Sequence, residues 1–146
     1  MSSQFDADNA DNLEEIEKQF AVKAVNQAET YWGLLEKIPG STLKLTKHDD
    51  DIFESLLQDF PEFKEPAKVA EIRESEMKSP EGKKRWRDFC EKFNEIEDYN
   101  FGTLLRTKSN EFYTQEGTIF AVRIQFYAIE IARNRYGLND WAVLKK

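Results

Sequence analysis

TIFAVRIQFYAIEIARNRYGLND, residues 118–140, is the stretch that decides the fold. At 100° per residue its apolar side chains cover most of the circumference of a helix, which is typical of a helix buried at the centre of a domain. Thr114 can cap this helix, which we expect over residues 115–136, and Gly137 is placed to end it in the left-handed conformation. The sequence therefore predicts a buried C-terminal helix.

One narrow polar stripe interrupts the apolar surface of this helix. Its residues follow one another at steps of four, three and four: Arg123, Tyr127, Glu130 and Asn134. Buried polar groups need partners, so the stripe is either an internal network that holds the helix or an exposed recognition groove. Arg133 and Arg135 lie in the last turn, where cations interact favourably with the helix dipole. We expect these two arginines to reach the surface.

A second long helix is predicted on the N-terminal side. From Leu13 to Ile38 apolar residues recur at steps of three or four, with Asn12 as a possible cap and Pro39 as a stop. Residues 1–11 are acidic and lack any period, which predicts a disordered arm. Residues 12–146 then form a single helical domain.

The intervening segments predict shorter elements. A helix should follow Asp49 or Asp50, and another should follow the capping residue Ser79. Residues 64–78 are a loop or a marginal helix, and residues 99–107 are extended, with a hairpin partner near Lys44 or Thr118. The expected fold is mainly α: a compact orthogonal helical domain with at most a small β-hairpin.

Composition excludes several kinds of chemistry. The 146 residues include a single cysteine, Cys90, and a single histidine, His48. An intrachain disulfide, a zinc site of cysteines and histidines, and a histidine pair for iron are therefore excluded. No glycine-rich phosphate loop is present. Cys90 falls on an apolar face, which indicates an inert thiol, and we expect no catalytic residue, no metal and no cofactor.

The charge pattern is uneven. The net charge is −7, which argues against DNA as a partner, yet residues 83–87 read KKRWR. Three interpretations of this run stay open: a solvated basic face, a docking site for an acidic protein surface, and an RNA-binding site. Trp86 belongs to an apolar face, apart from the basic side chains.

The chain shows no feature of a membrane or secreted protein. Its apolar runs are far shorter than the roughly 20 residues that cross a bilayer. The first residues lack the basic segment and apolar run of a secretory signal. We therefore expect a cytosolic or nuclear protein.

Four motifs resemble those of a small eukaryotic family, the polysaccharide biosynthesis domain-containing protein 1 family. They are HDDDIF (48–53), KSPEGKKRWRDFCEKF (78–93), NFGTLLR (100–106) and the long final motif at 118–140. The resemblance covers residues 13–140. Its family name is linked to plant polysaccharide methyltransferases, but this sequence lacks a glycine-rich cofactor loop and an isolated carboxylate pair.

The resemblance implies a cytosolic chaperone dedicated to newly made translation elongation factor 1-alpha, acting on its GTPase domain near the ribosome. Further expected partners are the ribosome or nascent-chain factors, and we expect a monomer. The alternatives are a ribosome-associated adaptor or scaffold and a polysaccharide-modifying transferase. As client-binding residues we expect the basic groups near the C-terminal helix end and on the basic face: Arg133, Arg135, Lys83, Lys84, Arg85 and Arg87.

Overall fold

The described chain is built mainly from helices, with one two-stranded sheet. The computed structural model describes residues 7–144, and the side chains of residues 21–143. The elements are α1 (Ala7–Lys37), α2 (Asp49–Asp59), α3 (Pro66–Ala70), α4 (Glu74–Met77), α5 (Pro80–Glu91), β1 (Gly102–Arg106), β2 (Thr118–Val122), α6 (Arg123–Arg135) and α7 (Trp141–Leu144), with 3₁₀ turns at Gly40–Thr42 and Pro61–Lys64. The expected mainly-α class is confirmed.

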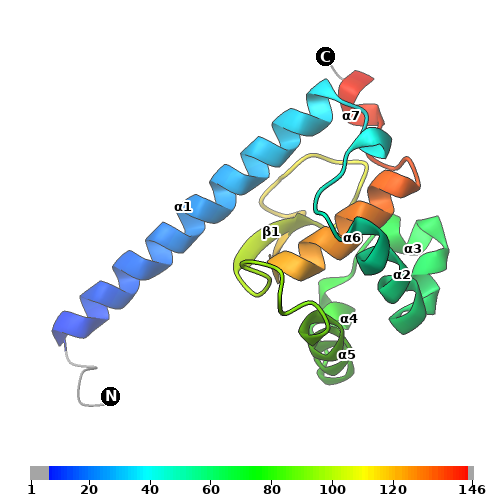
Figure 1. The fold of residues 1–146 in the computed structure, drawn as a ribbon. Helices are drawn as coiled ribbons and strands as arrows, with labels where there is room; N and C mark the ends of the chain where they lie inside the picture. Colours follow the sequence, from blue (N-terminus) through cyan, green and yellow to red (C-terminus); the bar gives the residue numbers. More distant parts are fainter. Residues whose placement is uncertain (1–6, 145–146) are drawn as a thin grey trace.

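Helix α6 lies between two groups of elements. It contacts β1 and β2 on one side and α2, α3 and α5 on the other, while α1 packs against β1. Figure 1 shows this order, from α1 through the hairpin and α6 to α2 and α3. Ile124, Ile129 and Ala132 are fully buried, so α6 is the central helix that its apolar circumference predicts. Gly137 ends this region with φ of 74°, as expected.

The start of α6 differs from the prediction. We expected one helix over residues 115–136, but residues 118–122 form strand β2 and α6 begins only at Arg123. The segment TIFAV is β-branched and aromatic, and its burial alternates along the strand, as suits a pleated strand with one buried face. Thr114 does not cap a helix; its Oγ1 accepts a hydrogen bond from Gly117 N at 3.0 Å and closes a turn.

The two strands pair antiparallel, with Leu104 opposite Phe120. Residues 102–106 are thus extended as predicted, and Thr118 rather than Lys44 marks the partner strand. The long N-terminal helix is confirmed by the buried stripe Ala24, Ala28, Tyr31 and Leu35.

Helix α1 begins at Ala7, five residues before the expected cap Asn12. Of the predicted acidic arm, residues 7–11 therefore belong to α1, and residues 1–6 lie outside the described residues. In Figure 1 the N-terminal part of α1 extends away from the other elements. No helix in the described range is both long and apolar enough to span a bilayer.

Aromatic rings from the end of α2 and from α5 close the other side of the core. The Phe60 and Trp86 ring centroids are 4.3 Å apart, and those of Trp86 and Phe89 are 5.5 Å apart.

Ser79 caps α5 as predicted, accepting from Gly82 N at 3.0 Å. Asp49 does not cap α2: its carboxylate accepts instead from the backbone N–H groups of Leu45 and Thr46. Residues 64–78 form the short helices α3 and α4.

Candidate functional site

The polar stripe of α6 is an internal network over half of its length. Glu130 and Asn134 are buried. The Tyr31 hydroxyl donates to Glu130 Oε1 at 2.8 Å, and Asn134 Nδ2 donates to the Tyr31 oxygen at 3.2 Å. Arg123 and Tyr127 are only half-buried and do not join this network. Of the two interpretations of the stripe, the internal network therefore holds for Glu130 and Asn134 and is wrong for Arg123 and Tyr127.

Two other arginines pair with Glu130. Arg106 from β1 places Nη2 3.0 Å from Glu130 Oε1, and Arg133 places Nη1 2.8 Å from Glu130 Oε2. Arg106 was missed in the sequence, although a charged residue directly after Leu104 and Leu105 in a predicted strand was a signal that it needs a buried partner. The carboxylate thereby joins β1 to α6.

Arg133 does not reach the surface. Its side chain is fully buried and donates to the backbone carbonyls of Val69, Arg106 and Thr107 as well as to Glu130. The reason is its position three residues after Glu130, which keeps both side chains on the inner face of α6. Arg133 is therefore a structural residue, and the expectation that it contacts a client is wrong.

The charges of this network depend on one another. Burial alone would raise the pKa of Glu130, but Arg106, Arg133 and the hydrogen bond from Tyr31 outweigh it and lower this pKa to about 2. Burial opposes the charge of both arginines; Glu130 outweighs burial at Arg106, whose pKa is raised, but not at Arg133, whose pKa is lowered. Burial, with the nearby Glu130, also raises the pKa of Tyr31, which stays a neutral donor.

The remaining predicted client-binding residues lie on the surface, and they differ in whether they form ion pairs. Lys83, Lys84 and Arg87 are exposed, and within residues 21–143 they form no ion pair. Arg85 is engaged: it holds Glu62 through two bonds and lies 4.3 Å from the Phe60 ring centroid.

Arg135 is exposed as predicted and is also engaged. It pairs with the carboxylate of Asp50, and its guanidinium lies 5.0 Å from the Phe53 ring centroid. Trp86 is buried, apart from the basic side chains, as the sequence indicated.

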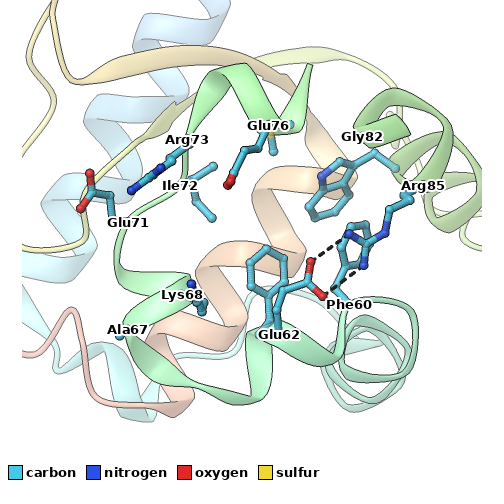
Figure 2. Close-up of a pocket in the computed structure, with 13 residues that line it drawn as sticks. Phe60, Glu62, Ala67, Lys68, Glu71, Ile72, Arg73, Glu76, Gly82 and Arg85 are labelled. Carbon is cyan, nitrogen blue, oxygen red and sulfur yellow. Dashed lines mark hydrogen bonds and ion pairs between the residues drawn. The ribbon is translucent and has the colours of Figure 1, made fainter. Parts of the chain in front are cut away.

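One open pocket lies among the short helices α3, α4 and α5. It has a volume of about 460 Å³, and Figure 2 shows Glu62 and Arg85 facing each other at its rim. Three acidic and three basic side chains line it, namely Glu62, Glu71, Glu76, Lys68, Arg73 and Arg85. The two signs balance, so this pocket does not favour a ligand of either charge.

The lone cysteine, Cys90, lies buried on the apolar face of α5, as the sequence predicts. Burial, with the nearby carboxylate of Glu91, raises the pKa of its thiol to about 12, and such a thiol is a weak nucleophile at neutral pH. Across the described residues, no three His, Cys, Asp or Glu side chains are placed to share a metal ion.

A larger, more apolar hollow lies beside the long helix. We call it the α1 groove: about 680 Å³, with Val25, Trp32 and Gly33 on one wall and Leu104, Phe112 and Phe120 on the other. Leu104 and Phe120 are partners across the hairpin. Glu29 and Glu36 also line the groove, and among the side chains of residues 21–143 no basic one does.

Several large apolar side chains at this groove face solvent. Phe120 is 58% exposed, Phe112 50% and Val25 46%, and Val22 continues the same surface along α1 at 58%. A cluster of exposed apolar side chains on a folded domain is typical of an interaction site. Sequence reasoning missed it, although Val22 and Val25 fall outside the buried stripe of α1 and could have indicated a second apolar face.

The buried network also holds the outer wall of the groove. Arg106 Nη1 donates to the carbonyl oxygens of Ser109 and Glu111, which precede Phe112. The same guanidinium lies 5.5 Å from the Trp32 ring centroid and 5.8 Å from that of Tyr113. Arg106 thus connects the buried network around Glu130 to the wall of the α1 groove.

Comparison with known proteins gives consistent matches over nearly the whole chain. The family model described as "PBDC1 protein" matches residues 16–144. The Protein PBDC1 homologs of Schizosaccharomyces pombe and Saccharomyces cerevisiae are each 59% identical, over 97% and 99% of both chains respectively. A solution NMR structure of a Saccharomyces cerevisiae protein, 59% identical, matches with a TM-score of 0.87 over 99% of both chains.

Proposed function

The chain belongs to the PBDC1 protein family, and from this premise we propose that it is a dedicated chaperone of translation elongation factor 1-alpha. It binds the GTPase domain of this client while the domain is newly made and incompletely folded. The role follows from the family resemblance described above. The observation in the structure that supports it is the α1 groove, an exposed apolar surface on a well-packed domain.

An exposed apolar surface suits a partly folded client. Such a client has apolar segments that its own core does not yet cover, and these are stabilised when they leave water against another apolar surface. A folded client no longer offers them. Its affinity for the chaperone therefore falls as folding proceeds, because a binding partner favours only the state that it contacts better.

The magnitudes favour reversible binding. Fully burying one large apolar side chain contributes about 1.5–3 kcal/mol. Val22, Val25, Phe112 and Phe120 are each about half exposed, so covering them contributes on the order of 4 kcal/mol in total. This is comparable with the loss of free motion on association, about 4–15 kcal/mol. The client must add polar or charged contacts, and a modest loss of contact then suffices for release.

The test is cell-free synthesis of the GTPase domain of elongation factor 1-alpha with and without this protein. We expect the protein to raise the fraction of the domain that stays soluble and binds GTP. A GTPase of another family, synthesised under the same conditions, is the control and should not respond. An equal yield with and without the protein would contradict the proposal, and an equal gain for both GTPases would favour a general adaptor.

A further inference from the structure

We propose that the α1 groove binds an amphipathic helix of the client whose apolar stripe is flanked by lysine or arginine. The inference rests on the proposed function only for the identity of the chain that supplies this helix. Three features of the groove indicate this ligand: its shape, the open space over Gly33, and its charge.

The shape of the groove fits a helix of about three turns. Its α1 wall extends from Val25 to Glu36, which at 1.5 Å per residue is about 16 Å. The residues of this wall recur at helical spacing, so they present a ridge against which side chains at i, i+3 or i+4, and i+7 of a second helix can pack. An extended strand would instead need a free sheet edge, whereas side chains line this groove.

Gly33 supports a close approach by another backbone. A glycine inside a helix lowers stability by about 0.5–1 kcal/mol relative to alanine. At Gly33 no contact among the described residues explains that cost, because a Cβ there would meet none of their atoms within 4 Å. A partner helix that lies over Gly33 can approach α1 more closely than it could over a residue with a side chain. Such an approach would explain why a glycine occupies this position.

The charge of the groove selects the partner. Glu29 and Glu36 stand one heptad apart on the α1 wall, and within the described side chains neither forms an ion pair. The loop of the opposite wall adds exposed Glu111 and Glu116 and carries no basic residue between 109 and 117. Basic side chains beside the apolar stripe of the client helix would meet these carboxylates.

Two variants test the groove without disturbing the fold. Gly33→Leu fills the groove from a position where the new side chain has open space, and leucine favours a helix more than glycine does. Glu29→Lys with Glu36→Lys reverses the charge of the wall. Glu54→Lys with Glu97→Lys is the matched control, since both of these residues are exposed and neither lines the groove.

The probes are two helical peptides of about 15 residues. They share one leucine stripe and differ only in carrying lysine or glutamate beside it, and binding to the whole protein is measured by fluorescence anisotropy. We expect the lysine peptide to bind and Gly33→Leu to weaken it at least about ten-fold. The Glu29→Lys, Glu36→Lys variant should prefer the glutamate peptide, and the control should behave as wild type.

Equal binding of both peptides by the wild-type protein, or an unchanged affinity in Gly33→Leu, would overturn the inference. Light scattering adds a further outcome: a dimer that Gly33→Leu dissociates would show that a second copy occupies the groove, which also overturns it. If the peptides behave as expected but the protein does not assist the GTPase domain in cell-free synthesis, the proposed function fails and the groove assignment stands.

Discussion

Glu130 shows how much a single buried carboxylate connects. It receives hydrogen bonds from Tyr31 of α1, Arg106 of β1, Arg133 of α6 and Asn139 before α7. Glu130 and Asn134 are internal, which is one of the two interpretations that the spacing of the α6 stripe left open. The spacing could not identify the partners, because Tyr31 is 99 residues away and Arg106 is 24 residues away in the sequence.

The pKa of Glu130 predicts acid sensitivity. The folded protein holds this pKa at about 2, against 4.5 for the free side chain, so the unfolded chain binds the proton more readily. The stability that Glu130 contributes is therefore fully present above about pH 4.5 and is lost as the pH falls towards 2. The loss should be on the order of 3 kcal/mol. Urea titrations between pH 7 and 2.5 measure it, and Glu130→Gln should show a flatter pH profile over this range.

Arg133 and Arg123 should differ in their effect on stability. Arg133→Gln breaks a buried pair and leaves three carbonyls without their donor, so we expect it to cost about 3–5 kcal/mol. Arg123→Gln is the matched change on the same helix. Arg123 is half-buried and its Nε has no partner, so the cost should stay within about 1 kcal/mol. Chemical denaturation of both variants would contradict the structure if Arg123→Gln were the more damaging.

At the scale of elements, periodicity predicted helices well and their boundaries less well. The apolar stripes of α1 and α6 and the cap of α5 are local features that the sequence carries directly. Periodicity placed residues 118–122 in the first turns of the last helix because the four residues after Thr118 are all apolar. Residues 118–122 form a strand because they pair with β1, and this pairing is a tertiary contact that no local sequence pattern contains.

Two glycines in helices should respond in opposite directions to alanine. Gly33→Ala adds a side chain in open space and should stabilise the protein by about 0.5–1 kcal/mol, or about 1–4 °C in Tm. Gly82→Ala should destabilise it, because the new Cβ would lie 2.1 Å from the carbonyl oxygen of Glu76. Calorimetry of the two variants side by side tests this contrast, and a loss of stability in Gly33→Ala would show that the groove is not open there.

At the scale of the whole molecule, the groove and the basic surfaces belong to different parts of the chain. Lys83, Lys84 and Arg87 lie on α5, whereas Glu29 and Glu36 lie on α1. The sequence predicted the basic face because a run of like charges is visible in one segment. It could not predict the groove, whose walls come from α1, the hairpin and the loop before β2. Surfaces assembled from distant segments appear only once the fold is known.

We propose that this protein holds newly made elongation factor 1-alpha and releases it as it folds, and the cell-free reaction can measure both steps. The measurement is the fraction of labelled GTPase domain that co-precipitates with the protein, taken when synthesis stops and again after GTP is added. We predict a large bound fraction that falls on addition of GTP as the domain becomes protease-resistant. A bound fraction that is absent at the start, or that does not change while the domain folds, would contradict the account.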